Sequence, residues 1–270
     1  MKKGYWKYVV SLLILAIYLM PIYVVVVTSL KPITNLEPRL TLPKEIYWEN
    51  YVRLFRDTGI LKAILNSMMI TAGTLILVVV VGGMAAYPIA RMKNRAGNIA
   101  RVIVMGVMMV RGMAMVVGLY SVLSSMHALS TYWGMILVDA AFGLPVAIYM
   151  YSNFISSIPD VLDEAAAIDG AGVFGTFWKI IVPQLKPVTV SIVVMQGVSI
   201  WNEYGFATYI LQKPDMYNVT LVVKQYFGEA VKDLNGAAAS AVIAIIPVVI
   251  VYLLLQKYFV MGAVDSAVKG

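Results

Sequence analysis

Cysteine is absent from the 270 residues, which excludes disulfides and metal sites built on thiolates. Histidine is nearly absent as well. His127 is the only one, so no cluster of histidines can hold a metal ion. We therefore expect no metal-binding residues in this chain.

Charged residues are also scarce, at 13% of the chain. A soluble domain carries about 25%. Hydrophobic residues make up 61%, and the mean hydropathy is +0.82, which indicates that lipid is the solvent for much of the chain. The net charge is +7, but the basic residues are dispersed and no nucleic-acid-binding motif accompanies them. The sequence therefore predicts basic loops against anionic membrane lipid and no nucleic-acid partner.

Long apolar runs predict an all-α polytopic membrane protein. A bilayer core requires about 20 apolar helical residues. Six stretches meet this requirement, and the first lacks the small-residue cleavage site of a signal peptide. No repeat or change in composition marks a second domain, so residues 1–270 are expected to form one transmembrane domain. The predicted spans cover about 8–30, 64–90, 102–123, 132–152, 188–211 and 237–259.

The distribution of basic residues predicts the orientation. The segment RMKNRAGNIAR, residues 91–101, is a dense basic cluster between the second and third spans. Short loops rich in Lys and Arg stay in the cytoplasm. Both termini are therefore expected inside the cell, together with the polar loop 153–187.

The loop 153–187 contains the sequence SIPDVLDEAAAIDG, which is typical of a short helix. Ser157 is expected to cap the helix, with Asp160 three residues later as the second half of a capping box. Gly170 is expected to end it in a left-handed conformation.

A second short helix is expected directly afterwards, with one apolar stripe. Two readings of the loop follow from the residues alone. It could lie on the lipid surface, or its acidic helix could bind a protein, because anionic lipid repels acidic side chains. The stripe comprises Phe174, Phe177, Trp178 and Ile181.

The segment EAAAIDGAGVFGTFWKIIVPQLKP, residues 164–187, resembles the cytoplasmic EAA loop of ABC importer permeases. The agreement is with the carbohydrate, maltose-type branch of that family. Other short motifs along the chain resemble the same branch. They are Asn66-Ser67, Ala85-Ala86-Tyr87, Trp201-Asn202-Glu203 and the final Ala267-Val268-Lys269-Gly270.

The resemblance implies that this loop is a coupling helix seated on an ATP-hydrolysing subunit. Glu164 would pair with a basic residue of the ATPase, and Gly170 would permit close approach. Ala165 and Ala166 would be the small residues that let the helix sit deeply, with Asp169 and Ala171 completing the motif. The implied partners are a second permease subunit, two ATPase subunits, an extracellular solute-binding protein and a sugar.

Catalytic motifs are missing from the sequence. It has no G-x-x-x-x-G-K phosphate loop, no G-x-S-x-G and no H-E-x-x-H. We therefore expect a transport subunit and no enzyme, with no cofactor bound by this chain. ATP and magnesium are expected on the partner ATPase subunits.

Charged residues inside the predicted spans are candidates for the transport path, because charges at membrane depth usually face a bundle interior or a wet cavity. Arg111, Asp139 and Glu203 are expected at neighbouring depths from the helical rise. They could line a sugar path or join helices to one another. Arg111 requires a negative partner, either Asp139, with Glu203 in reserve, or an acidic substrate. The fifth span adds Gln196, Ser199, Asn202 and Tyr204.

Together these observations predict one permease subunit of an ATP-driven sugar importer, in the cytoplasmic membrane of a bacterium or archaeon. Asn202 and Glu203 are expected to have a structural or gating role near the outer mouth. Two alternatives stay open. One is a permease of the same type for amino acids, glycerol phosphate or acidic sugars, and the other is a passive channel.

Overall fold

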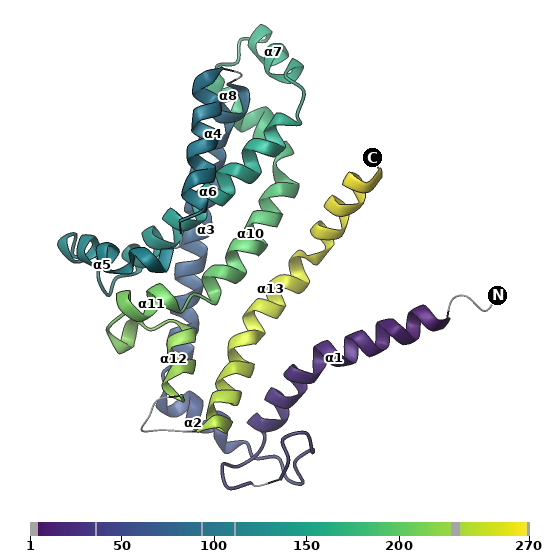
Figure 1. Ribbon diagram of the computed structural model, residues 1–270, viewed down its shortest axis with the longest axis vertical. Coiled ribbons are helices and arrows are strands. Elements are labelled where there is room, and N and C mark those ends of the chain that lie inside the picture. The colour runs from purple at the N-terminus through teal and green to yellow at the C-terminus, as the bar shows by residue number, and fades with distance from the viewer. Residues whose placement is uncertain (1–4, 36, 93, 111, 228–232, 269–270) are drawn as a thin grey trace. The chain divides into compact units, whose positions relative to one another are not determined.

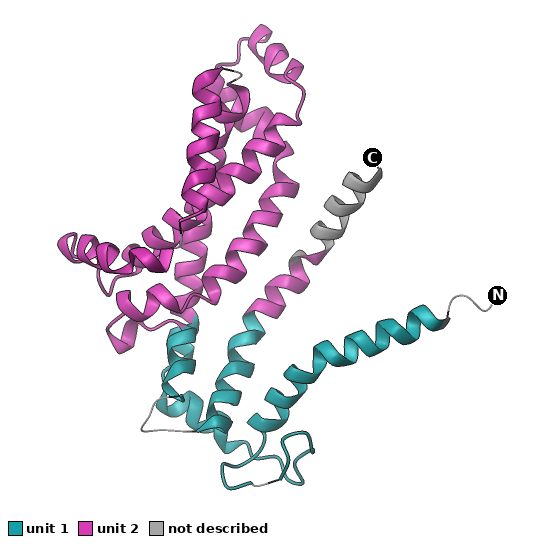
Figure 2. Cartoon of the chain, viewed as in Figure 1, with its two compact units in different colours: residues 1–64, 219–247 teal, residues 65–218, 248–270 magenta. Residues whose placement is uncertain are grey.

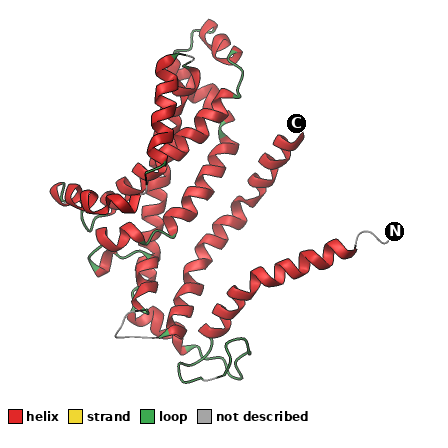
Figure 3. Ribbon diagram, in the orientation of Figure 1, coloured by secondary structure: helices red, strands yellow, loops and turns green. Residues whose placement is uncertain are grey.

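The computed structural model describes residues 5–35, 37–92, 94–110, 112–227 and 233–268. Within these ranges every regular element is a helix (Figures 1 and 3). The α-helices are α1 (Tyr5–Ser29), α2 (Glu49–Asp57), α3 (Ile60–Arg91), α4 (Arg95–Met108), α5 (Val116–Ser125), α6 (Tyr132–Ser156), α7 (Val161–Ile168), α8 (Val173–Thr176), α9 (Val182–Gln184), α10 (Lys186–Trp201), α11 (Gly205–Ile210), α12 (Val219–Gln225) and α13 (Leu234–Val268). Shorter turns of other types are η1 (Gly112–Met115), the π-helix η2 (Phe177–Ile181) and η3 (Pro214–Met216).

Four of these helices are long and apolar enough to cross a membrane, namely α1, α3, α6 and the first part of α13. The number rises to six if each of two bent helix pairs counts as one span. The predicted all-α fold with several candidate membrane helices is therefore confirmed. The exact number of spans and the side of the termini stay predictions.

The third and fifth predicted spans are not single straight helices. Within 102–123, α4 ends at Met108 and is followed by η1 and α5, and Arg111 lies outside the described residues. Within 188–211, α10 ends at Trp201 and α11 begins at Gly205. The Oε1 atom of Glu203 accepts a hydrogen bond of 2.6 Å from the amide of Phe206, so this side chain starts a new helix where continuation of the first was expected.

The chain separates into two compact units (Figure 2). One comprises residues 1–64 and 219–247, and the other comprises residues 65–218 and 248–270. The expectation of a single permease domain stays a prediction. The second unit contains the loop 153–187 and all the described candidate site residues.

The first unit is held together by hydrogen bonds at the C-terminal end of α1. The buried Asn50 side chain, on α2, donates to the carbonyls of Ser29 and Lys31 at 2.8 and 2.9 Å. The Asn235 side chain donates to the carbonyls of Thr28 and Lys31 at 3.0 and 2.7 Å. Carbonyls at the end of a helix run out of intrahelical donors, so the two amides add partners to the last turn of α1 and to Lys31 just beyond it.

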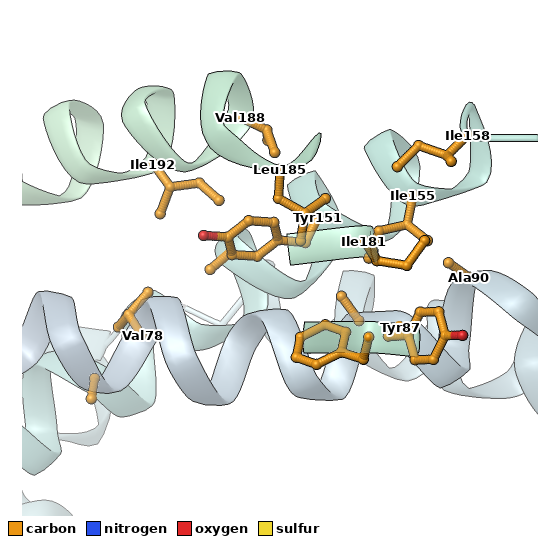
Figure 4. Close-up of a cluster of buried hydrophobic side chains, with 14 residues drawn as sticks. Val78, Tyr87, Ala90, Tyr151, Ile155, Ile158, Ile181, Leu185, Val188 and Ile192 are labelled. Carbon is orange, nitrogen blue, oxygen red and sulfur yellow. The ribbon is translucent and has the colours of Figure 1, made fainter. Parts of the chain in front are cut away.

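The second unit has an apolar core contributed by α3, α6, η2 and α10 (Figure 4). Glycine permits close contact between α3 and α6. A Cβ atom added at Gly82 would lie 3.1 Å from that of Ala147. Small residues of this kind let membrane helices pack backbone to backbone. The labelled core residues include Val78, Tyr87, Tyr151, Ile155, Ile181 and Ile192, all buried.

Candidate functional site

The acidic helix α7 forms as the sequence predicts, but its start differs. Ser157 does not cap it, because the Ser157 hydroxyl donates to the carbonyl of Phe154 at 2.7 Å and belongs to the end of α6. The residue before α7 is Asp160, whose side chain makes no capping hydrogen bond. At the other end, Gly170 has a φ of +80°, and the amide of Ala171 donates to the carbonyl of Ala166 at 2.9 Å. The prediction that Gly170 ends the helix in a left-handed conformation is confirmed.

The expected apolar stripe of the second short helix is only partly correct. Phe177 and Ile181 are buried, whereas Phe174 and Trp178 are exposed. The reason is the π-helical turn, in which the amide of Val182 bonds to the carbonyl of Phe177, five residues back. This wider turn changes which residues share a face, so a stripe drawn at α-helical spacing fails.

The residues of the EAA motif differ in how much of each side chain is exposed to solvent. Glu164, Ala165, Asp169 and Gly170 are exposed on α7 and the turn that follows it, and Ala171 is half-buried. Ala166 is 3% exposed and packs inside the unit. Only Ala165 of the two alanines is therefore available to a partner protein.

Large apolar side chains lie on the surface beside this motif. Ile168 is 87% exposed, and Val173 and Phe174 are similarly open. They belong to the end of α7 and to α8. Acidic and apolar side chains thus share this surface, and the acids disfavour contact with anionic lipid.

The start of α7 is held by a single basic side chain at the end of α3. One guanidinium nitrogen of Arg91, Nη1, donates to the carbonyls of Ile155 and Ile158 at 3.1 and 3.0 Å. It also donates to Asp160 at 2.9 Å, and the second nitrogen, Nη2, donates to Asp163 at 2.6 Å. Arg91 therefore joins α3 to the end of α6 and to the start of α7.

Tyr87 lies one helical turn before Arg91 and supports the same contact. Its hydroxyl donates to the second carboxylate oxygen of Asp163, and its ring lies 5.4 Å from that of Phe177. Sequence reasoning interpreted Arg91 only as a basic residue of the inner loop and assigned Tyr87 no contact. The sequence did contain a signal for this contact. Tyr87 and Arg91 are four residues apart and Asp160 and Asp163 are three apart, so each pair lies on one helical face and the two pairs are complementary in charge and hydrogen bonding.

The polar residues of the predicted spans converge on one cavity of about 350 Å³, within the second unit. Asp139 lines it from α6, and Gln196 and Ser199 line it from α10. Glu203 lines it from the turn before α11. Asn202 and Tyr204 are not among its lining residues, and the Asn202 side chain donates to the carbonyl of Val198 at 2.8 Å.

The cavity lining combines polar and apolar side chains. Asp139 is 8% exposed, and its Oδ2 atom has no hydrogen-bond partner among the described residues. Gln196 donates through Nε2 to the carbonyl of Gly143 at 3.4 Å. Phe142 and Phe206 form an apolar wall, with stacked rings 4.9 Å apart.

No group of three or more acidic or histidine side chains that could hold a metal ion occurs in the described ranges. That this chain binds no cofactor stays a prediction.

Comparison with known proteins identifies the family. Residues 78–262 match the family described as "Binding-protein-dependent transport system inner membrane component". This is a family of transport subunits and not of enzymes.

Relatives are similar over nearly the whole chain. The melibiose/raffinose/stachyose import permease protein MelC of Bacillus subtilis is 33% identical, covering 94% of this chain and 92% of the relative. The multiple sugar-binding transport system permease protein MsmG of Streptococcus mutans is 32% identical, covering 98% and 97%. A chain in the crystal structure of a bacterial ABC transporter involved in the import of the acidic polysaccharide alginate has a TM-score of 0.81 at 23% identity, covering 95% and 96%. The chain belongs to the family of inner membrane components of binding-protein-dependent transport systems.

Proposed function

We propose that this chain is one permease subunit of an ATP-binding cassette importer for a sugar or oligosaccharide. The family match and the names of the relatives support transport of sugars. In the complete importer, a second permease subunit completes the path and a solute-binding protein delivers the sugar from outside. Two ATPase subunits bind ATP and magnesium on the cytoplasmic side.

The chain crosses the membrane six times in this proposal, with both termini in the cytoplasm. The third crossing is formed by α4, η1 and α5, and the fifth by α10 and α11, beside the four continuous helices. The basic cluster at 91–101 and the polar loop 153–187 then lie on the same, cytoplasmic side.

The observation that carries the proposal is the contact between Arg91 and the start of α7. A helix that binds an ATPase must pass the movement of that partner to the membrane helices. Arg91 bonds to Asp160 and Asp163 on one side and to the end of α6 on the other, from its own position at the end of α3. A displacement of α7 is therefore transmitted to α3 and α6 without a flexible linker between them.

The surface of α7 suits a protein partner. Glu164 and Asp169 are exposed acids, and Ile168, Val173 and Phe174 are exposed apolar residues nearby. Glu164 pairs with a basic residue of the ATPase in this proposal. Ala165 is the small residue exposed to the partner in this proposal. Ala166 is buried and packs α7 against the rest of the unit.

Purification of the tagged chain from its own host in mild detergent tests the proposal. An ATPase should co-purify, and ATP hydrolysis should rise when a sugar-loaded binding protein is added. Absence of any ATPase would favour a passive channel. If amino acids or glycerol phosphate stimulated ATP hydrolysis and sugars did not, the chain would be a permease of the same type for those solutes.

A further inference from the structure

The short helix α2 lies between two candidate membrane spans and is held close to both of them. At the end of α1, the carbonyls of Ser29 and Lys31 accept hydrogen bonds from the buried Asn50 side chain of α2. Only two residues separate the end of α2 from the start of α3, and two residues reach at most about 7 Å. Because the first span ends and the second begins beside it, α2 lies at the surface of the membrane.

One face of α2 is apolar and exposed. Trp48, Val52 and Phe55 occur at i, i+4 and i+7, a spacing that places them on one side of a helix. All three are between 44% and 61% exposed. Asn50 and Leu54, which point in another direction, are fully buried within the first unit. The apolar face of Trp48, Val52 and Phe55 is therefore not used in packing within the unit.

The charged side chains of α2 lie on the side away from Leu54. Glu49 and Arg56 are exposed and seven residues apart, so they share a face that borders the apolar one. Arg53 bonds to Asp233 at 3.2 Å, which joins α2 to the start of α13 (Figure 1). Around the helix axis, the apolar face thus lies between the protein and the charged face.

We propose that α2 lies in the outer interface of the bilayer, with its apolar face among the lipid acyl chains and its charged face toward water. A helix with these two faces binds that boundary, where its apolar side chains reach about 5–10 Å below the headgroups. Tryptophan, present here as Trp48, is enriched at the same depth. The assignment to the outer leaflet rests on the six crossings of the proposed function. A solute-binding protein would approach from water, on the side of the charged face.

Single cysteines test this placement, because the chain has none of its own. Val52→Cys and Phe55→Cys mark the apolar face, and Glu49→Cys and Arg56→Cys are the matched controls on the charged face. All four positions are exposed. Each importer is labelled with bimane and placed in nanodiscs of phosphatidylethanolamine and phosphatidylglycerol. The parent importer gives the background from the other subunits, and ATP hydrolysis shows that each labelled variant is folded.

Lipid carrying a nitroxide at carbon 5 of its acyl chain should lower the fluorescence at Val52→Cys and Phe55→Cys, with little loss at the two controls. A nitroxide at carbon 12 lies deeper and should quench less. Iodide, which stays in water, should give the opposite order of the two faces. In intact cells, Arg56→Cys should react with an impermeant thiol reagent. Reaction only after the inner face is opened would overturn the assignment to the outer leaflet.

Equal quenching of both faces by iodide, without quenching by lipid, would overturn the proposal and place α2 in water. Apolar-face labels that neither quencher reaches would overturn it in favour of contact with the second permease subunit. Iodide quenching that disappears only on addition of the solute-binding protein would overturn it in favour of that protein. Failure of the proposed function is recognised separately, by the absence of a co-purified ATPase. In that case the labelled chain alone is placed in the nanodiscs, because lipid quenching requires only its insertion.

Discussion

The guanidinium of Arg91 bonds to the carboxylate of Asp163 across 2.6 Å and 72 residues of sequence. The pair is mostly buried, with side chains 16% and 21% exposed. It joins the last turn of α3 to the first turn of α7. A carboxylate in the first turn of a helix is also favoured by the helix dipole, so this contact stabilises both partners.

Replacement of Arg91 should separate the movement of α7 from that of the membrane helices. Arg91→Met removes the guanidinium from its two carboxylate and two carbonyl acceptors and should lower the free energy of unfolding by about 2 kcal/mol. The loss is moderate because one of the carboxylates is partly exposed. Arg91→Lys keeps the charge but cannot reach four acceptors with one ammonium group. Both variants should hydrolyse ATP with reduced stimulation by the loaded binding protein.

The matched control is Arg95→Met, which removes an exposed base near the same end of the membrane. It should leave stimulation and thermal stability unchanged. Normal coupling in Arg91→Met, with the protein correctly inserted, would show that Arg91 does not transmit the movement.

Glu164→Lys should weaken the contact with the ATPase without destabilising the chain. Because Glu164 is exposed, a change in its charge should leave the stability of the fold unchanged. Reversal of the charge opposite a basic groove should reduce both the amount of co-purified ATPase and the rate of transport. Glu45→Lys, the same change at another exposed position, is the control. Unchanged co-purification in the first variant would exclude Glu164 from the interface.

Gly170→Val should destabilise the turn after α7 by straining the backbone, and not by a steric clash of the new side chain. A Cβ atom added there meets nothing within 4 Å, but φ is +80°. An L-residue in the left-handed region costs about 1–2 kcal/mol, and a β-branched one is less tolerated than asparagine. Stimulated ATP hydrolysis should therefore fall in Gly170→Val and largely persist in Gly170→Asn. Equal loss in both would indicate a docking contact that admits no side chain.

The side of each loop can be measured with single cysteines. Ile168→Cys, at a position 87% exposed, should react with an impermeant thiol reagent only after the inner face is opened. Leu42→Cys, at a position 70% exposed, should react in intact cells. The reverse pattern would overturn the predicted orientation and the cytoplasmic location of α7.

Sequence reasoning succeeded where structure depends on local composition. The helices and the left-handed Gly170 follow from short-range patterns. Gln196, Ser199 and Glu203 are spaced by three and four residues, which places them on one helical face. Tyr204 lies five residues after Ser199 and falls outside this spacing, whereas Asn202 lies three residues after Ser199 and fits it. The structure leaves both outside the cavity lining, and for Asn202 this follows the end of α10 at Trp201, which periodicity does not predict.

Contacts between distant segments were beyond that reasoning. The break after Trp201 depends on the side chain of Glu203 bonding to a backbone amide, and apolar composition gives no sign of it. The bonds of Arg91 to the ends of two other helices require the fold to be known first. The pairing of Arg111 with Asp139 stays a prediction, because Arg111 lies outside the described residues.

Replacement of Asn66 should lower the stability of the second unit by a measurable amount. Its side chain is 1% exposed and donates to the carbonyls of Asp215 and Tyr217 at 3.1 and 2.8 Å. It also accepts from the hydroxyl of Tyr132 at 2.8 Å. Asn66→Leu should cost about 1–3 kcal/mol, because two carbonyls lose their donor, and Tyr132→Phe should cost about 1 kcal/mol.

The double variant distinguishes a shared network from two independent effects. Its loss of stability, measured by unfolding in mixed detergent, should be smaller than the sum of the single losses by about 1 kcal/mol, since the bond between the two side chains is lost only once. Tyr120→Phe removes a tyrosine hydroxyl that accepts an exposed hydrogen bond from Gln212, and it should combine additively with Asn66→Leu. Additive losses for Asn66 and Tyr132 would mean that the hydrogen bond between them contributes nothing to the stability of the second unit.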